Sequence, residues 1–205
     1  MFTNTLPGNT STVLQRLKSV FLVKDFYLTG GTALSLQIGH RESQDLDFFS
    51  QNDFEPELVQ KQLEAIGSLE NVEIGKGTLN CFLDNVKLQF LHYPYQLLEP
   101  NIHWEGIQIS TKLDIACTKL ITVSVRGSKK DFIDIYFLLR EFDLRTLFEK
   151  LKKKYLKTNY NETHILKSLV YFVDAEEQPL PRMHIELSWE EVKENIINKV
   201  KNFEI

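Results

Sequence analysis

The sequence has little cysteine, no long apolar stretch and no large excess of charge of either sign. Its 205 residues include two cysteines, Cys81 and Cys117, each in an apolar part of the sequence and without the spacing of a metal site. We therefore expect two reduced thiols in a cytoplasmic protein. No apolar run approaches the roughly 20 residues that a membrane helix requires, and the first residues lack a signal-peptide pattern, so no membrane partner is expected.

The charges are nearly balanced, with 24 basic and 28 acidic side chains and a net charge of -4. Phosphate binding needs a basic surface, so this balance by itself argues against a nucleic-acid partner. The charge is unevenly spread, however, because residues 145–157 carry one arginine and five lysines against one glutamate. Lys152, Lys153 and Lys154 in this segment are the expected contacts to an RNA backbone; the alternative is a solvated helix face.

Hydrophobic patterning divides the chain near Thr111 into a mixed first half and a helical second half. The first half begins with a strand that ends at a glycine turn and a helix that opens at about Thr32. The other elements predicted for this half are a strand over 45–50, a helix over 56–67, three strands between 71 and 93, and a short strand over 107–110. The second half is predicted to contain helices near 112–126, 129–142, 144–157, 162–173 and 189–203. The chain is therefore expected to have the α+β class.

Two motifs in the first half carry the strongest functional signal. Asp45 and Asp47 are two apart on a predicted strand, so both carboxylates point to the same face. Their mutual repulsion is relieved by a divalent cation, and hard oxygen ligands suit Mg²⁺ or Mn²⁺. Upstream, Gly30 and Gly31 let the backbone approach a phosphate, and the helix at Thr32 offers free N–H groups and its positive dipole end.

Each motif alone has a structural explanation. A Gly-Gly pair is commonly a tight turn, and an Asp-x-Asp pair is commonly a solvated strand face. Their order, strand–glycine–helix–strand, favours nucleotide chemistry, which requires both phosphate positioning and charge neutralisation. Arg41 lies in the intervening loop, where it could contact a phosphate or pair with Glu42 or Asp45.

Three segments resemble the AbiEii/AbiGii abortive-infection toxin family. LTGGTALSLQIGHRESQDLDFF, residues 28–49, resembles its nucleotidyltransferase signature. KLITVSVRGSKKDFIDIYFLL, residues 119–139, resembles its second block, whose matching positions are Lys119, Arg126, Lys130, Asp131 and Asp134. SLVYFVDAEEQPLP and the later WEEVK resemble the tail of small members, so the likeness extends from about residue 25 to residue 200.

The resemblance implies a polymerase-β-like nucleotidyltransferase core with a mixed sheet over residues 1–110, followed by a helical lobe over residues 111–205. It implies that Asp45 and Asp47 hold the metal and that Gly30, Gly31 and Thr32 line the phosphates. It also implies that Lys119 and Asp131 complete the active site from the helical lobe. Arg126 and Lys130 would then contact the nucleotide.

The residues of the second block agree with an anion site but also allow a structural role. Lys119 and Arg126 are seven apart, two helical turns, and so share one stripe of a largely apolar helix. Lys130 stands in the first turn of the next helix, where the dipole disfavours a cation. The alternative is that Asp131 caps its own helix with Ser128 and that Lys119 pairs with a carboxylate.

One position departs from the polymerase-β pattern, which usually places a third carboxylate on a neighbouring strand. In the predicted strand near 86–93, Lys87, Gln89 and Leu91 share one face. If the register sets Gln89 opposite the Asp pair, a neutral amide replaces that carboxylate, and an amide cannot act as a base. The chain would then be a weak enzyme, would use Asp131 instead, or would only bind nucleotide.

The expected function is an Mg²⁺-dependent transfer of a nucleoside monophosphate from a nucleoside triphosphate to an acceptor, with a tRNA-like RNA as the expected acceptor. The resemblance implies the toxin of a type IV toxin–antitoxin or phage-defence system, with a cognate antitoxin encoded nearby. One alternative is a catalytically weak or inactive module of the same fold that binds a nucleoside triphosphate or a partner. Another is nucleotide transfer to a protein side chain.

Overall fold

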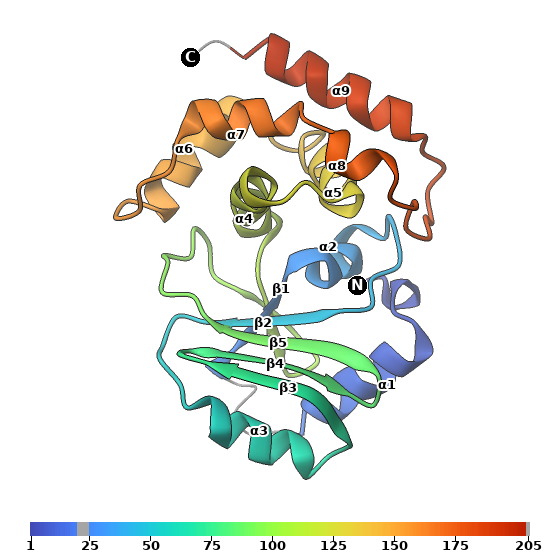
Figure 1. Ribbon diagram of the computed structural model, residues 1–205, viewed down its shortest axis with the longest axis vertical. Coiled ribbons are helices and arrows are strands. Elements are labelled where there is room, and N and C mark those ends of the chain that lie inside the picture. Colours follow the sequence, from blue (N-terminus) through green and yellow to red (C-terminus); the bar gives the residue numbers. More distant parts are fainter. Residues whose placement is uncertain (20–24, 204–205) are drawn as a thin grey trace. The chain divides into compact units, whose positions relative to one another are not determined.

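The computed structural model describes residues 1–19 and 25–203 and has an α+β architecture, which confirms the predicted class (Figure 1). The chain divides into two compact units. The first contains Met1–Tyr95 and Pro100–Thr111, and the second contains Gln96–Glu99 and Lys112–Ile205. Within the described ranges, no helix is both long and apolar enough to cross a membrane.

The first unit is built on a seven-stranded mixed sheet with the strand order β3-β4-β5-β2-β1-β7-β6. Strand β2 pairs antiparallel with β1 and parallel with β5, whereas β1 pairs parallel with β7. The strands are β1 Tyr27–Thr29, β2 Leu46–Ser50, β3 Leu69–Gly75, β4 Thr78–Leu83, β5 Val86–His92, β6 Ile102–Trp104 and β7 Ile107–Ile109. Of these strands, β6 was not predicted.

The two faces of the sheet have different chemistry. On β5, Leu88 and Phe90 are fully buried, whereas Lys87 and Gln89 point to the other side. Helix α3, Pro56–Glu64, packs against β3 and β4 and begins with a proline in its first turn. Helix α2, Gly30–Ile38, lies on the opposite face of the sheet from α3 (Figure 1). The polar residues of β5 therefore share their face with α2.

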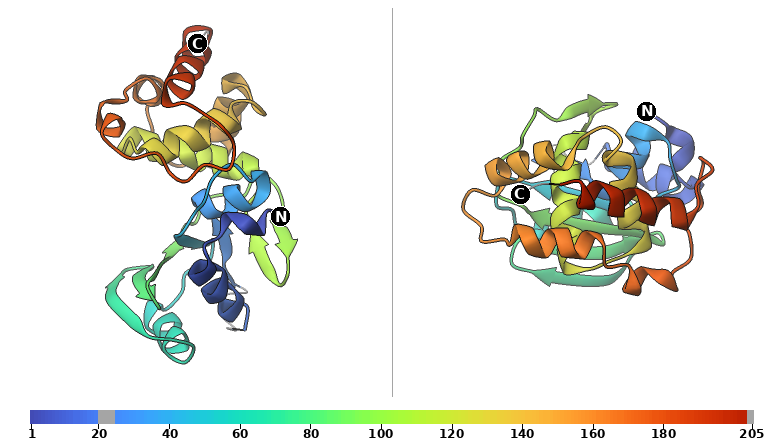
Figure 2. Two further views of the ribbon diagram at one scale, coloured as in Figure 1. Left: turned by 90° about the vertical axis from the view of Figure 1, so that its right-hand side faces the viewer. Right: turned by 90° about the horizontal axis from the view of Figure 1, so that it is seen from above.

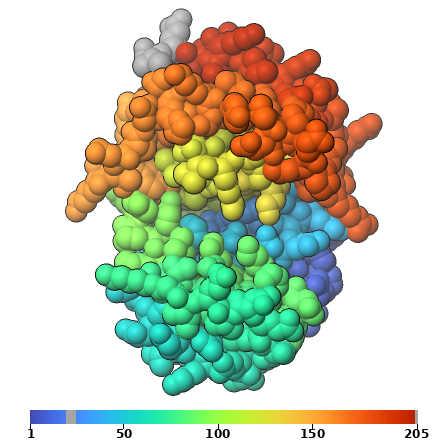
Figure 3. Space-filling model, in the orientation of Figure 1, coloured from blue at the N-terminus to red at the C-terminus, as the bar shows by residue number. Residues whose placement is uncertain are grey.

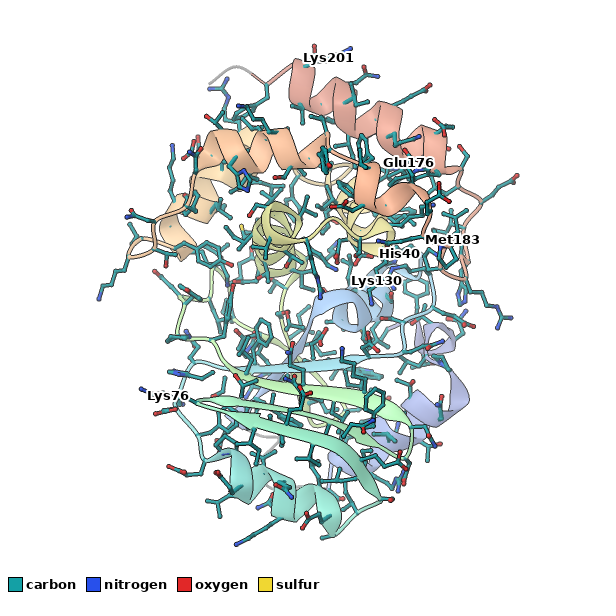
Figure 4. All side chains as sticks on the ribbon, viewed as in Figure 1. His40, Lys76, Lys130, Glu176, Met183 and Lys201 are labelled. Atoms are coloured by element: carbon teal, nitrogen blue, oxygen red, sulfur yellow. The ribbon has the colours of Figure 1, made fainter. Side chains whose placement is uncertain are left out.

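Strand β3 forms one edge of the sheet, and six of its seven residues are exposed. In the space-filling view its blue-green residues form much of the front surface of the first unit (Figure 3). Lys76 lies in the turn that connects β3 to β4 (Figure 4). A bulge between Glu70 and Glu73 interrupts the pairing of β3 with β4. Bulges are a common way to protect the edge of a sheet from the addition of another strand.

Two short helical elements precede the sheet and were not predicted. They are the 3₁₀ helix η1, Thr3–Thr5, and α1, Gly8–Leu17. Helix α1 has no side-chain cap, and its first half is rich in polar residues, so the sequence carries no start signal there. Burial of Val13, Leu14 and Leu17 holds the helix in place.

The second unit is helical. Helix α4 packs against α5, α6 and α7, and α9 contacts α5 and α7; Figure 2 shows α9 as the outermost helix of this unit. The helices are α4 Lys112–Val125, α5 Lys129–Leu138, α6 Leu144–Lys154, α7 Glu162–Leu169, α8 Val173–Glu176 and α9 Trp189–Lys201. The helix predicted over 162–173 ends at Leu169, and the separate helix α8 begins only at Val173, because the β-branched and aromatic residues at 170–172 favour helix weakly.

A buried ion pair ties the segment Gln96–Glu99 to the second unit. The carboxylate of Asp114 accepts hydrogen bonds from the backbone N–H groups of Leu98 and Glu99. It also pairs with the ammonium of Lys154 at 2.5 Å, and Lys154 donates to the carbonyl of Gln96. The predicted boundary between residues 110 and 111 lies one residue before the observed break between residues 111 and 112. The sequence did not predict that Gln96–Glu99 belongs to the second unit.

Candidate active site

The connection from β1 to α2 brings Gly30 against Asp47. Gly30 has a φ of +68°, in the left-handed region, and a Cβ on it would lie 2.5 Å from Oδ2 of Asp47. The left-handed backbone favours glycine at this position, and a Cβ there would force the Asp47 carboxylate to move from its present place. Thr29 pairs with Asp47 across the β1–β2 ladder, which fixes this relationship. Gly30 therefore makes room for a carboxylate at the start of α2.

The loop before β2 is fastened to the first turn of α2 by hydroxyl groups. The Thr32 hydroxyl is 2.8 Å from Oγ of Ser43 and donates to the backbone carbonyl of Asp45. Thr32 and Ser43 are both buried. The side chain of Thr32 thus holds the backbone of Asp45 in place; the prediction that Thr32 also lines a phosphate remains a prediction.

Asp45 and Asp47 are both half-buried, while Leu46 and Phe48 are fully buried in the core. Asp45 directly precedes β2 and Asp47 lies within it. Within residues 1–19 and 25–203, no cluster of three or more His, Cys, Asp or Glu side chains could hold a metal. Two carboxylates suit Mg²⁺, which takes one or two protein carboxylates and completes its shell with water and substrate phosphate. The donor set therefore fits the expected cation.

The register confirms that Gln89 stands where a third carboxylate was expected. Asp47 on β2 pairs directly with Gln89 on β5, so the two side chains share one face. The Nε2 group of Gln89 donates a 2.9 Å hydrogen bond to Oδ1 of Asn80 on β4. An amide has no proton-accepting role at neutral pH. The general base cannot be Gln89.

In the second unit, Lys119 sits between two buried carboxylates. Its Nζ lies 2.6 Å from Asp131 and 2.7 Å from Asp134, both fully buried. The Ser128 hydroxyl also donates to Asp131, and Arg126 approaches the same carboxylate at 3.7 Å. Ser128 occupies the N-cap position of α5, as the sequence indicated, but its hydroxyl binds a side chain. These contacts match the structural alternative considered for Lys119.

Two adjacent lysines open α5, and they differ in environment. Lys130 is exposed, whereas Lys129 is buried, and the sequence did not single out Lys129. The ammonium of Lys129 donates to the carbonyl of Glu176 at 3.0 Å and lies 5.1 Å from the ring centre of Trp189. Figure 4 labels Lys130 and Glu176. Lys129 therefore fastens α8 and α9 to α5.

The structure corrects one of the expected RNA contacts. Lys154 is 3% exposed, because its ammonium is engaged by Asp114 and by a backbone carbonyl. It cannot also neutralise a phosphate on the surface. Lys152 and Lys153 are exposed, and Lys152 forms a 3.2 Å ion pair with Glu162. One feature of the sequence does indicate a buried basic residue. Asp114 is a lone acidic residue in an apolar stretch, and a carboxylate that is buried needs a partner.

A family model and a bacterial protein are both similar to this chain over most of its length. The family model described as "Nucleotidyl transferase AbiEii toxin, Type IV TA system" matches residues 12–203. A protein of Aquifex aeolicus (strain VF5), described as uncharacterized, is 41% identical over 196 residues, which is 93% of each chain.

Solved structures share the architecture at low identity. MenT4, a nucleotidyltransferase toxin from Mycobacterium tuberculosis H37Rv, is 13% identical and superimposes with a TM-score of 0.56 over 96% of this chain and 85% of that one. JHP933 from Helicobacter pylori is 21% identical, with a TM-score of 0.58 over 94% of this chain and 89% of that one. At such identities the likeness shows the fold, which is the polymerase-β-like nucleotidyltransferase fold.

Proposed function

Because the chain belongs to the AbiEii family of nucleotidyl transferase toxins from type IV toxin–antitoxin systems, we propose that it transfers a nucleoside monophosphate from a nucleoside triphosphate to an RNA hydroxyl. The observation that carries the proposal is the fit of Gly30 to Asp47 at the start of α2. This fit brings the carboxylate of Asp47, which we propose binds the metal, to the N-terminus of a helix. A triphosphate with its cation needs both a carboxylate for the cation and a helix N-terminus for the phosphates.

In the proposed reaction, the backbone N–H groups at Gly31 and Thr32 receive the phosphates at the amino end of α2. Asp45 and Asp47 hold Mg²⁺ or Mn²⁺, which when bound neutralises charge on the triphosphate. The oxygen of the acceptor hydroxyl forms a bond to the α-phosphorus and gives up its proton to solvent water. The bond between the α-phosphorus and the bridging oxygen breaks, and pyrophosphate leaves with that oxygen. On the sheet, Asp47 is the register partner of Thr29 on β1 and of Gln89 on β5, and these pairings fix the position of β2 and of the loop before it.

The roles of the second unit rest on the resemblance. Lys119 and Asp131 belong to the proposed catalytic set, and Arg126 and Lys130 to the proposed nucleotide contacts. The Arg126 side chain is 69% exposed and therefore accessible to a phosphate. Asp134 provides a matched control for Asp131, since both are fully buried and both bind Lys119.

The proposed acceptor is a tRNA-like RNA, with Lys152 and Lys153 as its backbone contacts. Both side chains are exposed on α6, in the most basic segment of the sequence. We expect an activity on these substrates to take place in the cytoplasm. The family's type IV toxin–antitoxin description supports an antitoxin partner, and we propose that it is encoded nearby. Lys154 is not part of this surface.

A second candidate function is a catalytically weak or inactive module that binds the nucleoside triphosphate. Gln89 favours it, because the strand next to Asp47 supplies an amide in place of an acid. Calorimetry with each nucleoside triphosphate and Mg²⁺ measures binding, and a radiolabel assay measures turnover. Binding without turnover supports the module.

The test of the enzymatic proposal is transfer of label from an α-labelled nucleoside triphosphate to total RNA in the presence of Mg²⁺. Asp45→Asn and Asp47→Asn should each abolish the product while the thermal unfolding temperature stays close to that of the wild type. Wild-type product no greater than that of these variants would remove the enzymatic proposal. Mass spectrometry of the proteins in the same reactions detects transfer to a side chain.

A further inference from the structure

A pocket of about 450 Å³ lies within the second unit, bordered by the start of α6 and the end of α9. Its volume falls in the range of roughly 300–1,000 Å³ that is usual for sites of small organic groups. None of its residues belongs to the candidate active site. The pocket is lined by Asp143, Leu144 and Arg145 from the start of α6, and by Asn195, Asn198, Lys199, Asn202 and Phe203 from the end of α9 and the residues directly after it.

Three amide side chains give one wall of the pocket its hydrogen-bonding groups. Asn195, Asn198 and Asn202 are spaced by three and four residues, so they share one face of α9. Asn198 and Asn202 are exposed, whereas Asn195 is half-buried. The Oδ1 atom of Asn195 is buried and has no hydrogen-bond partner among the described residues, a state that a nearby donor would improve. This wall therefore suits the polar edge of a ligand.

The charges around the pocket favour an anion. Two cations, Arg145 and Lys199, line it against one carboxylate, that of Asp143. Asp143 caps α6, and its carboxylate accepts a 2.7 Å hydrogen bond from the backbone N–H of Thr146. This bond holds the pKa of Asp143 below its ordinary 3.8. The helix end thus offsets the charge of Asp143, while Arg145 and Lys199 are both exposed.

An aromatic ring completes the lining. Phe203 is half-buried and packs on Phe148, with 5.2 Å between the ring centres and 30° between the ring planes. Phe148 is 3% exposed and supports Phe203 from the interior. Proteins bind unpaired bases of single-stranded RNA by stacking them on aromatic side chains. Ring, amides and cations together match the base face, the base edge and the phosphate of a nucleotide.

The pocket also continues the basic surface of α6. Arg145 and Lys152 are seven residues apart, two helical turns or about 10 Å, and so share one stripe of the helix. Glu149 lies between them, and Lys153 follows Lys152, so three cations on this part of α6 stand against one carboxylate. An RNA strand that contacts Lys152 and Lys153 can therefore extend along α6 to Arg145.

We propose that this pocket binds one unpaired nucleotide of the RNA acceptor. Its base stacks on Phe203, its base edge meets the three amides, and its phosphate lies at Arg145 and Lys199. Adenine is the expected base, because an asparagine amide pairs with the N6 and N7 atoms of adenine. The inference rests on the proposed function, in which RNA is the acceptor, and it deepens that function by naming a subsite and a base.

The test measures fluorescence anisotropy of labelled single-stranded oligoadenylate and oligouridylate, without a nucleoside triphosphate. Asn198→Ala should weaken oligoadenylate binding by about fivefold or more, and should leave oligouridylate within about twofold of the wild type. Alanine is the better helix former, so this variant should keep its fold. Lys199→Gln should weaken both oligonucleotides and lower the slope of log affinity against log salt by about 0.7.

Lys201→Gln is the matched control for Lys199→Gln. Both lysines are exposed in the last turn of α9, but only Lys199 lines the pocket; Figure 4 labels Lys201. The control should leave both affinities and the salt slope unchanged. Thermal unfolding of each variant checks that a loss of binding is not a loss of fold.

Equal salt slopes in Lys199→Gln and Lys201→Gln overturn the inference, and so does an equal effect of Asn198→Ala on the two oligonucleotides. A wild-type protein that binds neither oligonucleotide, or both equally, overturns it as well. None of these results touches the proposed function, which the transfer of label to total RNA tests separately. A wild type that transfers no label, yet prefers oligoadenylate through Asn198 and Lys199, overturns the proposed function and supports the pocket.

Discussion

Gly30 and Asp47 are complementary in shape, because the glycine leaves open the volume that the carboxylate uses. Oδ2 of Asp47 lies 2.5 Å from the place a Cβ of residue 30 would take. The contact joins two residues seventeen positions apart, at the point where we propose that a phosphate and a cation bind. It therefore couples the glycine motif to the aspartate motif physically.

Gly30→Ala should abolish nucleotide transfer by displacing Asp47 and should destabilise the fold by about 1–2 kcal/mol through the left-handed backbone. Gly106→Ala is its control. Gly106 also has a positive φ, of +85°, but no described atom lies within 4 Å of its would-be Cβ. Gly106→Ala should show the loss of stability in urea unfolding that comes from the backbone alone, Gly30→Ala should lose at least as much, and only Gly30→Ala should lose transfer. Full transfer by a folded Gly30→Ala protein would contradict the account.

Loss of one partner of the buried Asp114–Lys154 pair should destabilise the second unit strongly. Asp114 is 2% exposed, so Lys154→Met leaves a buried carboxylate without its ammonium, at a cost of about 3–5 kcal/mol. Replacing both residues, Asp114→Leu with Lys154→Met, should recover much of that loss. Urea unfolding measures both. A single variant as stable as the wild type would show that the pair is not structural.

Charge reversal at Lys152 and Lys153 should weaken RNA binding and its dependence on salt. Each phosphate contact that is lost should lower the slope of log affinity against log salt by about 0.7 for single-stranded RNA. Filter binding over a range of potassium chloride concentrations measures this. Nucleoside triphosphate affinity should stay unchanged. An unaltered salt slope would mean that Lys152 and Lys153 are only solvated and do not contact RNA.

Asp131→Asn and Asp134→Asn should separate catalysis from structure in the Lys119 cluster. Both substitutions remove one of the two carboxylates that bind the same ammonium, so similar losses of stability are expected. Only Asp131→Asn should lower kcat after correction for the folded fraction. Equal kcat values for the two variants would mean that the cluster is structural.

Acid should destabilise the fold through carboxylates that are stabilised as anions. The pKa of Asp84 lies below its ordinary 3.8 because the backbone N–H of Ser68 and the Arg16 side chain bind the carboxylate. The pKa of Glu176 lies below 4.5 through Lys193 and Trp189. Such groups stabilise the folded state above their unfolded pKa, and this stabilisation is lost as pH falls through the folded pKa.

The free energy of unfolding should therefore decrease as the pH is lowered below about 4.5. Asp84→Asn should lower stability at pH 6 and should reduce the slope against pH. Urea titrations at several pH values measure both quantities. A slope that is identical in Asp84→Asn and wild type would show that Asp84 does not contribute.

The sequence predicted the elements that have a strong period, and missed those that depend on contacts distant in sequence. The strand ending at Thr29 and the position of Gln89 on its strand follow from local pattern alone. Which strand lies beside Asp47 does not, because register is set by the whole sheet.

The candidate site residues came from the order of two motifs, which does not predict the side chains that lie next to them in the fold. Gly30 and Gly31 were expected to admit a phosphate, whereas the structure shows that their missing Cβ atoms admit Asp47 and Arg41. The burial of Lys154 could not be read from a run of lysines, since its partner Asp114 lies forty residues away. Spatial neighbours of this kind need the fold itself.

Transfer of the α-phosphate of a nucleoside triphosphate to an acceptor, as proposed for this chain, is tested most directly by a comparison of two labels. Parallel reactions with Mg²⁺ and total RNA should receive the same nucleoside triphosphate labelled at the α- or the γ-phosphate. We expect labelled RNA from the α-labelled substrate and labelled pyrophosphate from the γ-labelled one, with both signals absent in Asp47→Asn. Label on RNA from the γ-phosphate, or no transfer from either substrate, would contradict it.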